Sequence, residues 1–179
     1  MPVDLVDSHY GLDRDVADRF FAGDSLHCAI VRALGDERCM PIKEVVESFE
    51  VFEAVRRDVR SPVVADLCCG HGLPGMLLAA FERRVQTVHL CDVKFSEGSR
   101  KCLAAVERAA PWIRGRVLHH AARLQQASVD IPFTSALATH ACGRLTDQCL
   151  ELAIERCCPI AVTPCCYNRR TTTAAPVLV

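Results

Sequence analysis

The sequence predicts an α/β fold in which a mostly parallel sheet is covered by helices on both faces. From Ser61 onward, short apolar runs alternate with amphipathic helical patterns, and only short joints separate them. Such alternation is typical of strands that are connected by crossover helices and buried in a parallel sheet. The 179 residues are 50% apolar and 24% charged, a globular composition that suits about one domain and excludes a mainly disordered chain.

Residues 1–60 are expected to form a helical extension in front of the sheet. Asp24-Ser25 suits the cap of one helix, and Pro41 opens another. In the helix after Pro41 the apolar residues repeat at helical spacing: Val45, Val46, Phe49, Phe52 and Val55. The charged residues fall mostly on the other face: Glu44, Glu47, Glu50, Arg56 and Arg57. We interpret this extension as a lid or platform, for which plain packing is the default role.

Residues 61–179 are expected to form the sheet and its covering helices. The predicted strands are residues 63–67, 85–92, 115–122, 135–141 and 159–166, and the predicted helices are residues 73–84, 96–110 and 145–157. Pro111 should stop the second of these helices. We find no internal repeat or linker, and the last nine residues carry no periodic pattern.

Charge and hydropathy exclude several classes of function. With 21 basic and 22 acidic residues the net charge is −1, so no overall field draws the chain to nucleic acid or to an anionic membrane. The longest apolar stretch, Leu73 to Phe81, is too short for a membrane span, and the first residues do not resemble a signal peptide. Twelve cysteines occur without a C-x-x-C pair, which favours reduced structural thiols. We therefore expect a soluble cytoplasmic protein.

The segment VVADLCCGHGLPG, residues 63–75, is the most specific in the chain. After the strand that contains Asp66, Gly70 and Gly72 let the backbone turn tightly and approach a bulky ligand. No G-K-[ST] follows, which excludes a P-loop. We do not expect Gly75 to complete a three-glycine dinucleotide fingerprint, because it comes late in the motif. A strand–turn–helix without a ligand is the simpler alternative.

A second acidic residue strengthens the ligand hypothesis. Asp92 ends the next predicted strand, 26 positions after Asp66. Folds of this class place a carboxylate there that accepts hydrogen bonds from both hydroxyls of a ribose, although a strand-end turn residue is the alternative. The loops after the fourth and fifth predicted strands, residues 139–147 and 163–168, are expected at the same edge of the sheet, because ligands bind outside the carboxyl ends of parallel strands.

Taken in order, D-L-C-C-G-H-G, H-A-C-G-x-L-T-D and P-C-C-Y resemble the motifs of class I S-adenosylmethionine-dependent methyltransferases, which have a Rossmann-like fold. Within that class they are similar to a methyltransferase-domain family of bacterial and eukaryotic methyltransferase-like proteins. The tRNA acceptor-stem ribose methyltransferases are more distantly similar. The resemblance covers residues 60–168, and Cys68 stands where the general class usually has glycine. The D/N-P-P-Y/F tetrapeptide of many exocyclic-amine methyltransferases is absent.

This resemblance implies S-adenosylmethionine as the cofactor. It implies that Asp66, Gly70 and Gly72 lie against the methionine part of the cofactor, with hydrogen bonds from its amino-acid end to Asp66 made directly or through water. It also implies that Asp92 binds the ribose. Cys68 is expected to contact the cofactor as well.

The resemblance further implies that the loop of residues 140–143 lines the reaction centre. His140 would take a proton from the methyl acceptor, unless it is a satisfied core histidine. Asp147 would either orient His140 or serve only as a helix-turn residue. Cys165 and Cys166 could supply a thiolate nucleophile, or a metal site together with Cys142 and His140. Adjacent cysteines point apart, so we predict reduced thiols that shape the pocket and no metal.

We therefore predict an S-adenosylmethionine-dependent methyltransferase whose acceptor is RNA or protein rather than a small molecule. The alternative is a truncated, catalytically inactive domain that binds cofactor or RNA. Class I methyltransferases usually have seven strands, and only five are readable here. Either the C-terminal strands are missing from a fragment, or a second copy or another partner covers the apolar edge of the fifth strand.

Overall fold

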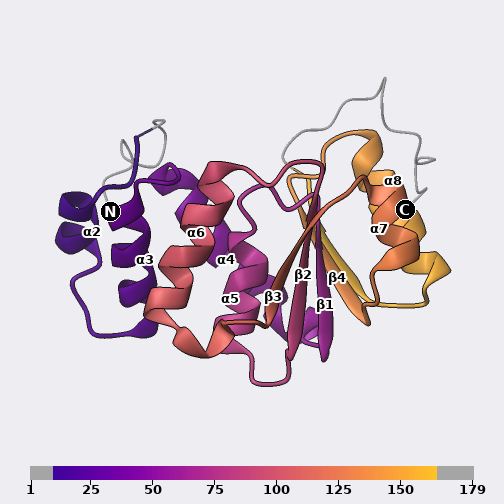
Figure 1. Ribbon diagram of the computed structural model, residues 1–179, viewed down its shortest axis with the longest axis horizontal. Helices are drawn as coiled ribbons and strands as arrows, with labels where there is room; N and C mark the ends of the chain where they lie inside the picture. Colours follow the sequence, from indigo (N-terminus) through magenta and orange to yellow (C-terminus); the bar gives the residue numbers. More distant parts are fainter. Residues whose placement is uncertain (1–9, 165–179) are drawn as a thin grey trace, which may run out of the picture.

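The described part of the chain contains one five-stranded parallel sheet, which confirms the predicted fold class (Figure 1). The computed structural model describes residues 10–164. Its strands are β1 (Val63–Leu67), β2 (Thr87–Asp92), β3 (Val117–Ala121), β4 (Ser135–Thr139) and β5 (Ile160–Thr163). They lie in the order β3-β2-β1-β4-β5. The strands β2 and β3 are therefore added on one side of β1, and β4 and β5 on the other. Such a switch point leaves a crevice between β1 and β4 at the carboxyl ends of the strands.

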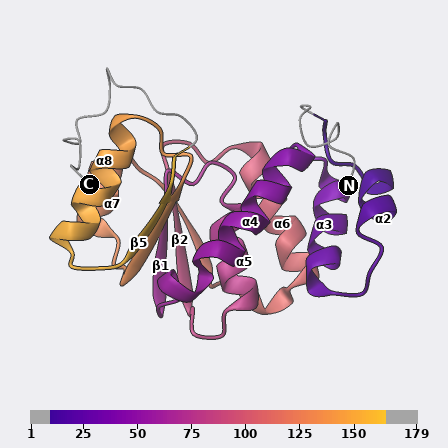
Figure 2. The same cartoon turned by 180° about the vertical axis from the view of Figure 1, so that it is seen from behind.

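Helices cover both faces of the sheet, as Figures 1 and 2 show from opposite sides. On one face lie α5 (Leu73–Phe81) and α6 (Glu97–Ala109), and on the other lie α7 (Leu124–Asp130) and α8 (Arg144–Glu155). Successive side chains of a strand point to opposite faces. In β1, Val64 therefore joins the core with α5 and α6, whereas Ala65 and Leu67 join the core with α8.

The helices that precede the sheet pack into the same hydrophobic core as α5 and α6. They are α2 (Arg14–Phe20), α3 (Leu26–Glu37) and α4 (Ile42–Val59). The α3 helix packs against α6, and α4 packs against α5, β4 and β5. Ile30 of α3 and Phe52 of α4 are fully buried in the same cluster as Leu77 of α5. The boundary at residue 60 stays a prediction, but the packing makes the N-terminal helices one wall of the core.

Several helices begin or end at the residues that the sequence predicts. Ser25 caps α3 by accepting a hydrogen bond from the backbone N–H of Cys28, and Pro41 stands at the N-cap of α4. At Pro111 the α6 helix has ended and the short 3-10 helix η1 (Pro111–Ile113) begins. The α7 helix was not predicted, because seven residues are too few for a clear apolar stripe. Parallel strands need a crossover between β3 and β4, and α7 lies within it.

Among residues 10–164, no helix combines the length and the apolar character that crossing a bilayer requires.

Candidate functional site

Two cavities open at the carboxyl ends of the strands, and Cys68 contributes to both. The larger, of about 830 Å³, lies between α4, the loop of residues 68–72 and the ends of β4 and β5. The smaller, of about 690 Å³, lies between the ends of β1 and β2 and residues 121–126. The two cavities therefore meet at the end of β1, which is the crevice that the strand order creates.

The loop between β1 and α5 takes a left-handed backbone at Cys68, Gly70 and Gly72, with φ of 56°, 55° and 75°. At Gly72 a Cβ atom would lie 2.7 Å from Cδ1 of Leu90, so this position needs glycine both for its φ and for space. A Cβ at Gly70 would meet nothing within 4 Å. The loop thus presents open space at Gly70, on the side where a ligand can approach its backbone.

Gly75 completes the glycine motif, and our expectation that it comes too late is wrong. Gly70, Gly72 and Gly75 have the spacing G-x-G-x-x-G. A Cβ at Gly75 would lie 2.9 Å from Oδ2 of Asp66 and 2.9 Å from Cδ2 of Leu90. The third glycine therefore lets α5 pack closely on β1 and β2, which is the role that this position has in dinucleotide-binding folds.

Asp66 lies behind the glycine loop and is fully buried. Its Oδ2 accepts a 3.0 Å hydrogen bond from the backbone N–H of Gly75, and its Oδ1 has no partner in the structure. Burial raises the pKa of this carboxyl well above its ordinary value. The structure therefore places Asp66 where it supports the start of α5 and holds one unpaired oxygen beneath the loop.

Asp92 joins the glycine loop to the smaller cavity. Its Oδ2 accepts a 2.9 Å hydrogen bond from the backbone N–H of Gly70, and its Oδ1 accepts a 3.3 Å hydrogen bond from that of Lys94. The hydroxyl of Ser99, in the first turn of α6, donates a 2.9 Å hydrogen bond to the carbonyl of Gly70. Both polar groups of Gly70 are thus held, and the half-buried Asp92 lines the smaller cavity.

Cys68 differs chemically from its neighbours. A hydrogen bond from the Cys149 thiol lowers the pKa of the Cys68 thiol. Burial, with Asp66 and Asp92 nearby, raises the pKa of the Cys69 thiol instead. Burial also raises the pKa of Cys91 to about 12. Cys68 is therefore the most acidic of the three thiols at the ends of β1 and β2.

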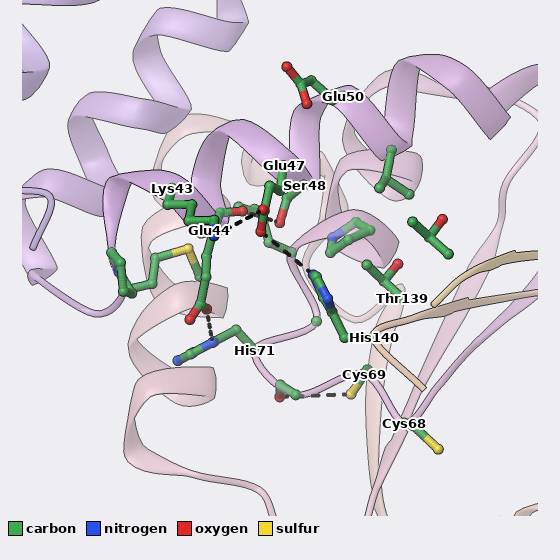
Figure 3. A pocket seen from close by; sticks show the side chains of 18 of the residues that line it. Lys43, Glu44, Glu47, Ser48, Glu50, Cys68, Cys69, His71, Thr139 and His140 are labelled. Carbon is green, nitrogen blue, oxygen red and sulfur yellow. Dashed lines mark hydrogen bonds and ion pairs between the residues drawn. The ribbon is translucent and has the colours of Figure 1, made fainter. Parts of the chain in front are cut away.

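His140 lies on the wall of the larger cavity, as Figure 3 shows. Its backbone has a φ of 62°, and its N–H donates a 2.9 Å hydrogen bond to the carbonyl of Thr163. Its side chain is 47% exposed, so it is not a buried core histidine. Its Nε2 lies 3.8 Å from Oε2 of Glu47. Asp147, in contrast, is buried in the first turn of α8.

The α4 helix contributes acidic residues to the site, although helical periodicity alone predicts only that they lie opposite its apolar face. Oε2 of Glu44 lies 3.0 Å from Nδ1 of His71, in the loop after β1. Glu47 faces two basic side chains: its Oε2 lies 3.8 Å from Nε2 of His140, and its Oε1 lies 3.8 Å from Nζ of Lys43 (Figure 3). The His71 partner lowers the pKa of Glu44, and Glu44 in turn raises the pKa of His71. Helical periodicity separated these carboxylates from the apolar face, but it did not tell which loops lie opposite them.

Thr139 ends β4 with an unsatisfied hydroxyl. Its side chain is part of the wall of the larger cavity, the residue is only 8% exposed, and its Oγ1 has no hydrogen-bond partner in the structure. A buried hydroxyl without a partner costs free energy, so this oxygen marks a place where a ligand can supply a hydrogen bond.

The metal hypothesis gains no support from the described part of the chain. Within residues 10–164, no three His, Cys, Asp or Glu side chains are arranged to hold an ion. Cys165 and Cys166, which the sequence analysis considered as ligands, lie outside the described residues.

Comparisons with known proteins bear on this geometry. The sequence profile of a family described as a methyltransferase domain matches residues 39–172, more than half of the chain, and so includes all of α4. The structure is similar to that of an O-methyltransferase family protein from Burkholderia thailandensis, with a TM-score of 0.51 and 16% identity. This match covers 96% of the chain and 51% of that protein, so the chain spans about half its length. At such identity the likeness shows the fold alone. No curated protein matches the sequence.

Proposed function

This chain belongs to the methyltransferase-domain family, and we propose on that premise that it binds S-adenosylmethionine and transfers its methyl group to an acceptor. The observation that carries the proposal is the hydrogen bond from the Gly70 N–H to Asp92, at the junction of the two cavities. A glycine loop and a carboxylate at the end of the next strand form a cradle for an adenosine ligand in folds of this topology.

The residues at the junction fit this cofactor. A carboxylate has about four lone-pair positions, and the hydrogen bonds from Gly70 and Lys94 leave Asp92 free to accept more, as two ribose hydroxyls require. Val93, Ala122 and Leu124 give the smaller cavity apolar surface against which an adenine ring would pack.

Residues of the loop after β1 suit the methionine end of the cofactor. The open space at Gly70 leaves room for a methionine moiety beside the loop. Cys68 lies where the adenosine and methionine parts would join, because it lines both cavities. Asp66 would act through the loop or through water, because its carboxyl is fully buried and its free Oδ1 lies beneath the backbone.

The chain's own residues would position the reactants and move a proton. When bound, S-adenosylmethionine supplies a methyl group that is electrophilic because it is attached to a sulfonium sulfur. His140 would accept the proton that the acceptor loses, because its exposed imidazole lies on the wall of the larger cavity. Asp147 would support the loop of residues 140–143 from the buried first turn of α8. The α4 helix would screen this region from water.

Isothermal titration with S-adenosylmethionine tests the proposal. Asp92→Asn should weaken binding about 10- to 100-fold, because a charged acceptor contributes roughly 1.5–3 kcal/mol per hydrogen bond. Asp58→Asn is the matched control, since Asp58 is exposed on α4 and lines neither cavity. The proposal fails if the folded protein does not bind the cofactor, or if Asp92→Asn binds it as tightly as the unaltered chain. Binding without methyl transfer to any acceptor tested would favour the inactive alternative.

A further inference from the structure

The wall that α4 contributes to the larger cavity carries more negative than positive charge. Glu44, Glu47 and Glu50 line the cavity together with a single lysine, Lys43. The side chains of Glu44 and Glu47 are 44% and 34% exposed, so both can meet a ligand. We propose that this cavity is the acceptor site and that it takes a cationic amine, an inference that rests on the proposed methyl transfer.

The charges around the cavity favour an ammonium group over a phosphate. No arginine is among the described residues that line it. Two of its basic groups face carboxylates: Nζ of Lys43 lies 3.8 Å from Oε1 of Glu47, and Nδ1 of His71 lies 3.0 Å from Oε2 of Glu44. Proteins hold nucleic-acid phosphates mainly with Arg and Lys and with neutral donors, whereas carboxylates repel them. The wall therefore disfavours an RNA backbone and favours a positively charged side chain or a polyamine-like group.

The hydroxyl of Thr139 is an independent sign of a ligand at the same place. Thr139 is more than nine-tenths buried and is one of the residues that line the cavity, and its Oγ1 has no hydrogen-bond partner in the structure. His140 follows it directly in the sequence. A hydroxyl oxygen accepts hydrogen bonds from an ammonium N–H, so a cationic amine would satisfy this buried oxygen beside the base.

The chemistry balances with the residues present. The ammonium group gives one proton to neutral His140, which leaves an amine with a lone pair. That lone pair forms the new N–C bond to the methyl carbon while the S–C bond breaks, and the electrons of the S–C bond stay on sulfur as a thioether. The carboxylate of Glu47, 3.8 Å from Nε2 of His140, stabilises the imidazolium that results. Glu47 is thus a positioning residue that acts through His140.

Fluorescence anisotropy tests the class of acceptor. Three labelled probes of equal length are titrated into the protein saturated with S-adenosylhomocysteine: a Lys/Gly peptide, a Ser/Gly peptide and a single-stranded RNA. We expect the lysine peptide to bind about tenfold more tightly than either of the others. The double variant Glu44→Gln, Glu47→Gln should lose this preference. Glu53→Gln, on the same helix but outside the cavity, should keep it.

The outcomes separate this inference from the proposed function. S-adenosylhomocysteine binding is measured first in each variant, by calorimetry, and its failure in the unaltered chain overturns both proposals. If the cofactor product binds but the RNA or serine peptide binds as tightly as the lysine peptide, only the amine inference is wrong.

A second measurement addresses Glu47 through methyl transfer to the lysine peptide. Glu47→Asp should keep more of the rate than Glu47→Gln, because the charge matters for stabilising His140. Glutamine matches glutamate more closely in size, so a packing role would give the opposite order and would contradict the inference.

Discussion

The backbone N–H of Gly70 donates a 2.9 Å hydrogen bond to the carboxylate of Asp92, which lies 22 residues further along the chain. This bond connects the loop after β1 to the end of β2. The two motifs that the sequence presents separately therefore form one structural unit. A ligand that reaches the end of β2 also meets the open backbone at Gly70. A substitution that moves the loop should therefore also move the carboxylate of Asp92.

Gly75→Ala should destabilise the protein by about 1–3 kcal/mol, as overpacking of a core usually does. The new Cβ would lie 2.9 Å from Oδ2 of Asp66 and 2.9 Å from Cδ2 of Leu90, and both residues are buried, so their side chains or α5 must shift. Urea unfolding measures the effect. Gly11→Ala is the control, because a Cβ there meets nothing within 4 Å. Equal stability of the two variants would show that α5 can shift away from the sheet at little cost.

Asp66→Asn should raise the free energy of unfolding at neutral pH. Burial holds the pKa of the native carboxyl well above 3.8, its ordinary value, so the folded state keeps this proton to higher pH than the unfolded chain does. Native stability therefore falls as the pH rises above that value, and an asparagine removes this loss. Its amide oxygen can still accept from the Gly75 N–H. Urea midpoints of the variant and the unaltered protein are measured at neutral and at acidic pH. If the variant gains no more stability at neutral pH than at acidic pH, the buried-charge explanation is wrong.

Two histidines, His89 on β2 and His119 on β3, should make the fold sensitive to acid. Nδ1 of His89 and Nε2 of His120 are 2.8 Å apart. Burial lowers the pKa of His89, and the neighbouring His120 lowers it further. Burial, His120 and Arg100 lower the pKa of His119 to about 4, from an ordinary value of 6.5. Between those two values the unfolded chain binds more protons than the native state, so stability should decrease as the pH falls through this range.

Replacing His119 isolates that effect. His119→Gln should show a shallower loss of stability than the unaltered protein when urea midpoints are measured from pH 6.5 down to pH 4. His27→Gln, at a half-buried position on α3, is the control for the loss of one imidazole. Identical slopes for all three proteins would mean that His119 titrates normally in the native state.

Bound cofactor should protect Cys68 from alkylation. Its thiol has a lowered pKa, is only partly buried and lines both cavities, so iodoacetamide should modify it faster than Cys91, whose pKa burial raises to about 12. S-adenosylhomocysteine should slow this reaction. Peptide mass spectrometry follows each site, and the exposed Cys157 reports the unprotected rate. If the ligand binds but Cys68 reacts at the same rate with and without it, the cofactor does not lie across the end of β1.

Much of the fold could be predicted from local patterns. Each of the five apolar runs contains a strand, and the caps at Ser25 and Pro41 start helices where expected. These signals are local, because apolar periodicity and capping depend on residues a few positions apart. The α7 helix escaped prediction because it is short and polar, and the role of Gly75 was missed although its spacing was visible in the sequence.

The candidate site divides in the same way. By itself the sequence determined where the glycine loop, Asp92 and His140 lie relative to the strands: after β1, at the end of β2 and after β4. Tertiary structure alone decided that Asp66 is buried behind the loop, that Asp92 holds Gly70, and that Glu47 of α4 faces His140. A helical pattern shows which face of α4 is apolar, but the packing of α4 against α5 and β5 determines which loop its carboxylates meet. That packing depends on contacts between residues far apart in the sequence, so no short segment encodes it.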